Sequence, residues 1–231
     1  MRGNPARIYP VTAVGETFPG LFQDYTASVI SQWERDHNDA VLDAMYDDLV
    51  LLGLTWKVTA KRVSDAAVEL QAGRLPSAAR RGSRDLVNIA DVGFGLSQVL
   101  PVIVALHAAG PKHLVYIEQP EIHLHPRAQV AMATVLARAV RRGVRMVVET
   151  HSGLLLLAVQ ALVAQGGEGL TPDLVKLHWF TRSEKDGTTR ITSAELDDAG
   201  AFGDWPEDFG DVELDIESRY IDAAQARMSK K

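Results

Sequence analysis

Acidic residues follow a short apolar segment near the middle of the sequence, and carboxylates in such a position can hold a metal ion or take up a proton. Residues 114–117 (Leu-Val-Tyr-Ile) are followed by Glu118, Gln119, Pro120 and Glu121. A carboxylate at the end of a strand can hold Mg²⁺ through water while the apolar run anchors it in the sheet. The same pattern also fits an acid in a simple turn, so both interpretations stay open at this point.

A second candidate is the segment 91–98, which reads Asp-Val-Gly-Phe-Gly-Leu-Ser-Gln and is followed by a helical pattern of apolar residues. Gly93, Gly95, Ser97 and Gln98 place flexible backbone and polar side chains at a helix N-terminus. There the backbone N–H groups and the helix dipole favour an anion such as phosphate. A plain helix-capping turn explains the same residues.

A third candidate is His151, which follows the predicted strand 144–148 and stands within the segment Glu-Thr-His-Ser. It is either a structural histidine or a group that contacts a ligand. All three candidates lie next to predicted strand ends, where open α/β folds place their ligands.

A parallel sheet is the element that can bring these residues together. In the second half of the chain, short apolar runs alternate with helical patterns, which is typical of a parallel sheet buried on both faces. The clearest strands are 113–117 and 144–148, and the helix between them starts at Pro126 and ends before Gly143. We therefore predict an α/β fold with a mostly parallel sheet flanked by helices.

The chain divides into three predicted parts. Residues 1–84 hold an irregular lead-in, a helical pair between 24 and 52, a hairpin over 55–71 and a basic loop. Residues 85–194 hold the sheet and the three candidate segments, together with a helix at 154–165 and strands at 174–181 and 188–192. Residues 195–231 are acidic, with ten acids and neither Lys nor Arg between 195 and 217, and include a helix near 212–227.

Composition excludes several classes of protein. With 231 residues and 46% hydrophobic residues, the chain can bury a sizeable core, so it is neither a disordered tail nor a miniprotein. The absence of cysteine excludes disulfide scaffolds, thiolate metal sites and thiol enzymes. No apolar run reaches the 18 or so residues of a membrane span, so we expect no membrane contact and a cytoplasmic protein.

The net charge of −6 argues against a protein that coats nucleic acid by bulk charge. Any DNA contact must come from a local patch. The basic loop with Arg74, Arg80, Arg81 and Arg84 can contact a DNA backbone, and it also fits a solvated surface.

The order and spacing of these segments resemble the C-terminal lobe of the ABC-type ATPases within the AAA grouping. That class includes the overcoming-lysogenization-defect, RecF and chromosome-maintenance ATPases. Further segments are similar to a bacterial subgroup whose C-terminal domain is of unknown function, so that the resemblance spans nearly the whole chain. The segments that carry the resemblance are Arg2–Pro5, Asp91–Gln98, Ile117–Pro126 and Phe202–Glu207.

The resemblance implies a role for each candidate. Gly93, Gly95, Ser97 and Gln98 match the signature loop, which contacts the γ-phosphate of ATP bound by the opposite subunit. Glu118 matches the acid on the Mg²⁺ side of the second nucleotide motif, and His151 matches the switch histidine that senses the γ-phosphate. Residues 122–125 (Ile-His-Leu-His) fall on the loop that crosses the dimer interface. ATP and Mg²⁺ are the implied cofactors, and phage defence or DNA maintenance is the implied setting.

Two departures from the family pattern limit this interpretation. Gln119 stands where most ABC ATPases carry the glutamate that polarises water, and an amide can orient water but cannot accept its proton. Glu121 can substitute as the base, although a solvated loop acid is the interpretation we favour. No G-x-x-x-x-G-K-[ST] phosphate loop occurs in the sequence. The chain thus looks like a lobe that is truncated, split from its partner or decayed, and ATP hydrolysis requires a homodimer or a partner lobe that supplies the loop.

Two other functions stay open. A lobe without a phosphate loop can serve as a catalytically dead scaffold or a regulatory binding module. The residues Glu118, Glu121, His123, His125 and His151 also resemble the beginning of an amidohydrolase-type metal site, which would make the chain a metal-dependent hydrolase. Such barrels need about eight strand–helix repeats, and only about two are visible here. For the two histidines of the His-x-His segment we favour an interface or capping role.

Overall fold

A computed structural model describes residues 6–74, 85–111, 113–166, 170–203 and 211–228. The chain divides into two compact units, Met1–Ala158 and Val159–Lys231. Helices and strands are mixed along the chain, so the predicted α/β class is confirmed. The predicted basic loop lies outside the described residues except for Arg74.

The first part of unit 1 is a helical pair beside a four-stranded antiparallel sheet. The central strand β3 pairs with β2 on one side and with β1 and β4 on the other. The predicted helical pair and hairpin are both confirmed. The elements are β1 (Tyr9–Pro10), α1 (Thr26–Arg35), α2 (Asp39–Leu51), β2 (Val58–Ser64), β3 (Ala67–Gly73) and β4 (Leu86–Asn88), with short 3₁₀ turns at Phe22–Asp24 and Ile89–Asp91.

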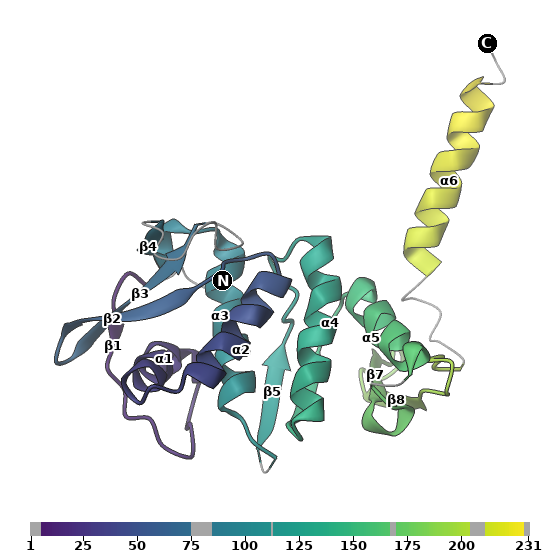
Figure 1. Ribbon diagram of the computed structural model, residues 1–231. Helices are drawn as coiled ribbons and strands as arrows, with labels where there is room; N and C mark the ends of the chain where they lie inside the picture. The colour runs from purple at the N-terminus through teal and green to yellow at the C-terminus, as the bar shows by residue number, and fades with distance from the viewer. Residues whose placement is uncertain (1–5, 75–84, 112, 167–169, 204–210, 229–231) are drawn as a thin grey trace. The chain divides into compact units, whose positions relative to one another are not determined.

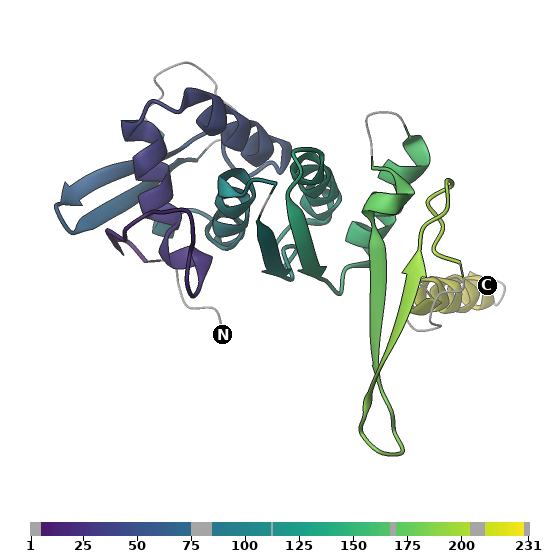
Figure 2. The same cartoon turned by 90° about the horizontal axis from the view of Figure 1, so that it is seen from below.

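The second part of unit 1 is a βαβ unit. It comprises α3 (Phe94–Ala108), β5 (Leu114–Glu118), α4 (Pro126–Arg141) and β6 (Arg145–Glu149). Strands β5 and β6 pair in parallel, as predicted, from Leu114 opposite Arg145 to Glu118 opposite Glu149. Figure 1 shows β5 between α3 and α4, and Figure 2 shows β6 beside it. Within the described residues, β5 and β6 form the one parallel strand pair, and the other strand pairs are antiparallel.

One face of the β5–β6 sheet is packed and the other is bare. Ile117 is buried, whereas Leu114, Tyr116 and Val147 are 64%, 58% and 50% exposed. Because side chains alternate between the two faces of a strand, these three residues share the outer face. The expectation of a sheet buried on both faces is therefore wrong for the described residues. The sequence supplies apolar residues for both faces, but the described elements cover only one.

The core of unit 1 lies among helices α1 to α4. Helical spacing puts Met45 and Leu49 on one face of α2, and both are fully buried together with Ile103 and Leu106 of α3. Asp48 lies on the same face of α2 and is also buried. It accepts hydrogen bonds from His107 on α3 (2.9 Å) and Arg138 on α4 (2.6 Å), so one carboxylate joins three helices.

Unit 2 contains two of the predicted strands, which the structure pairs as a hairpin, and the C-terminal helix. Strands β7 (Lys176–Arg182) and β8 (Thr189–Glu195) pair in antiparallel fashion, after a 3₁₀ turn at Pro172–Leu174. Helix α5 (Gly153–Gln165) spans the boundary between the units, and α6 (Asp211–Met228) closes the described chain. In the part of the chain that the structure describes, the helices are too short or too polar to cross a bilayer.

Gly200 gives a first testable prediction. Its φ is +74°, and a Cβ there would lie 2.3 Å from the backbone oxygen of Gln160 in α5. Replacing Gly200 with alanine is expected to destabilise unit 2 by about 2 kcal/mol, because the left-handed conformation and the backbone clash both penalise a side chain. Denaturant unfolding of the full chain checks this. Gly203→Ala, at φ +72° with open space around it, is the matched control and measures the conformational penalty alone.

Candidate functional site

The carboxyl ends of β5 and β6 lie side by side and place two acids on the same sheet face. Glu118 is the register partner of Glu149, and the Gln119 N–H donates to the Glu149 carbonyl at 2.7 Å. Since register partners of parallel strands point to the same face, both carboxylates emerge together at this edge. Sequence reasoning selected Glu118 but missed Glu149. The available signal was that Glu149 also ends an apolar strand.

A hydrogen bond fixes Glu149 on the bare face of the sheet. The Tyr116 hydroxyl donates to Glu149 Oε2 at 3.0 Å. This hydrogen bond, with the negative charges of Glu149 and Glu118 nearby, raises the pKa of Tyr116 above its ordinary value. Tyr116 therefore stays a neutral hydrogen-bond donor at neutral pH, and Glu149 is held beside Glu118.

Glu121 is the buried acid of the site. It is 7% exposed, and its Oε1 accepts a hydrogen bond from the backbone N–H of His151 at 3.1 Å. Its Oε2 is buried and has no hydrogen-bond partner among the described residues. The favoured expectation of a solvated loop acid is therefore wrong. The pairing of β5 with β6 brings the two loops together and encloses this carboxylate.

The turn that contains Glu121 has an uncommon backbone. Gln119 and His123 have φ values of +45° and +66°, in the left-handed region that most residues avoid. Two consecutive turns close around them, with N–H groups of Ile122 and Leu124 donating to the carbonyls of Gln119 and Glu121 at 3.2 and 3.0 Å. Conformations of this kind persist where the surroundings determine them, often at functional sites.

The loop with His151 is anchored to α4 and to the start of α5. The Ser152 hydroxyl donates to Gln129 Oε1 at 2.8 Å and accepts from the Leu155 N–H at 3.1 Å. The Gln129 amide in turn donates to the Leu124 carbonyl at 3.1 Å. The imidazole of His151 is exposed, on a backbone that is held at both sides.

The segment that resembles a signature loop packs against the turn after β5. Helix α3 begins at Phe94 with Gly93 as its N-cap, and the Ser97 hydroxyl donates within the first helical turns to the Phe94 carbonyl at 2.9 Å. The Phe94 ring contacts His123 edge to face, with centroids 4.9 Å apart. A Cβ on Gly95 would lie 3.0 Å from the His123 carbonyl oxygen, so a side chain here would require this turn to shift by a few tenths of an ångström. Gln98 is half-buried on the same helix.

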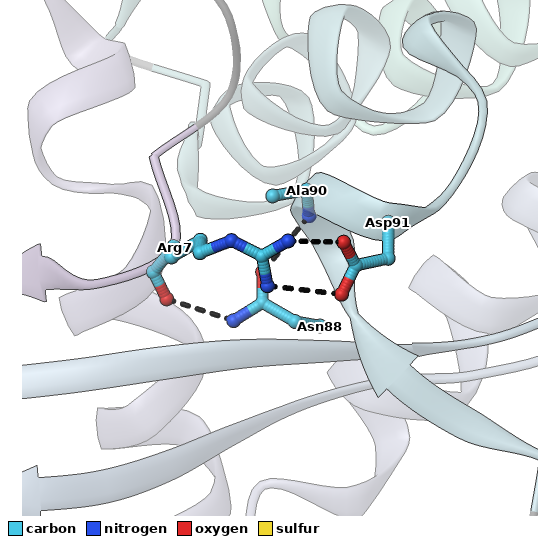
Figure 3. A network of polar contacts seen from close by, with 4 residues as sticks. All are labelled: Arg7, Asn88, Ala90 and Asp91. Atoms are coloured by element: carbon cyan, nitrogen blue, oxygen red, sulfur yellow. Dashed lines mark hydrogen bonds and ion pairs between the residues drawn. The ribbon is translucent and has the colours of Figure 1, made fainter.

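Arg7, in the N-terminal lead-in, contacts the residues just before α3. Two guanidinium N–H groups of Arg7 donate to the two carboxylate oxygens of Asp91. Asn88 donates to the Arg7 carbonyl at 2.9 Å, and its Oδ1 accepts from the Ala90 N–H at 2.9 Å (Figure 3). These contacts fix the chain just before Gly93 and so define where α3 starts.

The histidines of the His-x-His segment do not form a metal cluster. No group of three or more His, Cys, Asp or Glu residues is placed to hold a metal in the described ranges. The Nδ1 of His125 accepts from the Arg127 N–H at 3.3 Å and caps α4, which confirms the capping role for this residue. The structure therefore offers nothing in favour of the metal-dependent hydrolase. Of the basic loop, Arg74 is described and exposed, while Arg80, Arg81 and Arg84 lie outside the described residues.

Comparison with known families agrees with the sequence-based resemblance. Residues 71–158 match the family model described as "AAA domain, putative AbiEii toxin, Type IV TA system". This region contains β5, β6, the start of α3 and every candidate residue. No curated protein matches the sequence.

Three solved structures of SMC proteins match this chain. An SMC head bound to the C-terminal winged-helix domain of ScpA matches with a TM-score of 0.51 and 11% identity, over 77% of this chain and 51% of that chain. A structure from work on ATP-driven dimerisation of SMC ATPases matches with a TM-score of 0.45 and 13% identity, over 71% and 88% of the two chains. A Pyrococcus furiosus SMC head with an extended coiled coil, bound to the C-terminal domain of ScpA, matches with a TM-score of 0.49 and 10% identity, over 71% and 37%.

These findings define the class of domain. The fold is similar to that of an SMC head, and residues 71–158 match an AAA-domain model, so both comparisons agree with the resemblance to an ABC-type ATPase lobe. The chain spans about half the length of the first SMC head.

Proposed function

We propose that this chain supplies the signature-bearing lobe of an ABC-type ATPase that binds and hydrolyses ATP once a phosphate-loop lobe completes it. The observation that supports this most directly is the edge where β5 and β6 end. Two backbone-anchored loops bring Glu118, Gln119 and His151 to that edge. Their order along the chain is the order of the second nucleotide motif and the switch histidine.

The acids at this edge fit a magnesium ion. Mg²⁺ prefers oxygen ligands and is usually held by one or two carboxylates, with water and substrate phosphates completing the shell. Glu118 and its register partner Glu149 provide such a pair. Glu118 would hold the ion, with Glu149 beside it. Bound Mg²⁺ would neutralise charge on the phosphates of ATP.

The other candidate residues complete the proposed chemistry. Gln119 would orient the attacking water without accepting its proton, which makes hydrolysis slow. The exposed imidazole of His151 would contact the γ-phosphate. Gly93, Gly95, Ser97 and Gln98 would cover ATP held by the opposite subunit, since the N-terminus of a helix presents backbone N–H groups to an anion. ATP would then clamp two subunits together and hydrolysis would release them.

The exposed face of the β5–β6 sheet supports the proposal that a second lobe packs against this chain. Leu114, Tyr116 and Val147 form an exposed apolar row in a sheet class that is normally covered on both sides. The phosphate-loop lobe of a partner would cover this row. By analogy with the family, we place the assembly in the cytoplasm, in phage defence or DNA maintenance.

Reconstitution tests this function. ATP binding and turnover are expected to be undetectable for the chain alone and measurable when a lobe with a G-x-x-x-x-G-K-[ST] motif is added, because the phosphates need that amide cradle. Val147→Asp is expected to prevent the complex, whereas Ile191→Asp, at a similarly exposed apolar position on β8, leaves it intact. Absence of a gain with every such lobe would contradict the proposal.

A scaffold is the second candidate function, favoured by the amide at Gln119. It predicts a stable complex that binds ATP but does not turn it over. Wild-type turnover separates the two functions: an active but slow ATPase has a measurable rate, which Gln119→Glu raises because the new carboxylate can accept the proton of water, whereas a scaffold has no turnover before the substitution.

A further inference from the structure

We propose that Glu121 is a positioning residue that couples the loop after β5 to the loop after β6. Its role in catalysis rests on the function proposed above, while its role in holding the loops rests on the contacts alone. The Oε1 atom accepts the N–H of His151, and the residue itself belongs to the turn that starts at Gln119. A movement of either loop is therefore passed to the other through one side chain.

The backbone around Glu121 supports a coupling role. Gln119 and His123 stand two residues before and two residues after it, and both have positive φ. Neither is glycine, so the turn is held in a sparsely populated conformation by its surroundings. On one side it contacts Phe94 and Gly95 at the start of α3 through His123. On the other side, Glu121 fixes the amide of His151.

The second oxygen of Glu121 argues that the carboxylate does more than pack. Oε2 is buried without a donor among the described residues, and a buried polar atom without a partner is costly. An apolar residue of similar size would avoid this cost but could not accept the His151 N–H. Because Oε2 is buried, it cannot reach a water on the open edge of the sheet in this conformation. Glu121 therefore acts on the site through His151, not as the base.

Amide hydrogen exchange on the chain alone tests the contact. Glu121→Ala is expected to raise the exchange rate of the His151 amide about tenfold, the effect of losing one hydrogen bond to a charged acceptor. Glu121→Gln keeps a carbonyl oxygen at the Oε1 position and is expected to restore protection to within about twofold of the wild type. The matched control is Leu124→Ala, which removes a buried side chain of the same turn and leaves the Glu121 carboxylate in place.

The outcomes separate coupling from general loosening of the loop. Faster exchange in Glu121→Ala, with protection kept in Glu121→Gln and with Leu124→Ala near wild type at His151, supports the proposal. Unchanged exchange in Glu121→Ala would overturn it, as would an equal rise in Leu124→Ala or a failure of glutamine to restore protection. Thermal unfolding provides an independent check: Glu121→Gln is expected to keep or raise the Tm, because a neutral side chain that still accepts the His151 N–H replaces a buried carboxyl group.

A second measurement, in the reconstituted ATPase, tests the catalytic consequence. Glu121→Ala is expected to lower kcat by about tenfold or more with KM changed less than about twofold, because a displaced His151 weakens contacts made late in the reaction. Turnover in the wild type together with unchanged kcat in Glu121→Ala would refute the coupling role in catalysis. If the wild-type complex has no turnover, the proposed function fails, and the exchange experiment still decides whether Glu121 holds His151.

Discussion

Replacing Asp48 with alanine is expected to lower the free energy of unfolding by about 3 kcal/mol, and with it the Tm by about 6–12 °C. The side chain is 2% exposed and accepts hydrogen bonds from His107 and Arg138. Its removal leaves the 5% exposed His107 ring without its acceptor deep in the helical core. Arg138 is 43% exposed and can turn to water, which keeps the loss at the lower end of the range for broken buried pairs.

Asp47→Ala is the matched control for this prediction. Asp47 is the preceding residue on α2 and is exposed, so its replacement is expected to change stability by less than about 0.5 kcal/mol. Guanidinium unfolding followed by circular dichroism measures both variants. Equal, small effects of the two substitutions would show that the three-helix contact at Asp48 contributes little. A large loss of stability in Arg138→Ala would show that Asp48 stabilises the fold mainly through the Arg138 guanidinium group and not through His107.

Asp48 also illustrates what local sequence does and does not reveal. Spacing of three and four residues puts it on the same face of α2 as Met45, Leu49 and Leu52, so its burial follows from helical periodicity. Its partners, 59 and 90 residues away in the chain, do not follow from that pattern. The location of a buried acid can thus be predicted from the sequence, whereas the cations that satisfy it come from the packing of three helices.

The βαβ unit was predictable because each of its boundaries has a local chemical cause. Pro126 lies in the first turn of α4, and Gly143, which has a positive φ, follows the end of that helix. The two predicted strands match β5 and β6 to within one residue. The same apolar runs led to the wrong expectation for the outer face. Hydropathy shows that Leu114 and Val147 prefer burial, but only the neighbouring layers determine whether anything covers them.

The site was predictable in its strand ends and not in its loops. Glu118 and His151 follow apolar runs, and parallel pairing brings those ends to one edge. The sequence interpretation assigns Glu121 to a solvated loop. Its burial depends on the loop after β6, where its partner His151 stands 30 residues further along the chain. Long-range contacts of this kind leave no periodic pattern in the sequence. A carboxylate that the sequence assigns to the surface can therefore be buried in the folded protein.

Ser97→Arg and His151→Ala are expected to reduce ATP turnover of the reconstituted enzyme by about a hundredfold or more, the effect of removing one preorganised contact to developing charge. Ser97 lies in the first turns of α3, where arginine would obstruct the approach of the opposite subunit's nucleotide. His151 is exposed on an anchored loop, and it is the backbone N–H that bonds Glu121, so alanine removes a ligand contact while keeping the fold. Malachite-green assay of released phosphate measures both.

The controls decide whether such losses are specific to the site. Ser193→Arg and His178→Ala change the same residue types on the β7–β8 hairpin, where the two side chains bond each other at 2.8 Å, and are expected to keep turnover within about twofold. Wild-type turnover that is insensitive to Ser97→Arg and His151→Ala would remove both residues from the nucleotide site. If His151→Ala alone abolishes activity, the switch histidine stands and the chain works without covering a second subunit's ATP, because Ser97 is the one of the two replaced residues that is assigned to the opposite nucleotide.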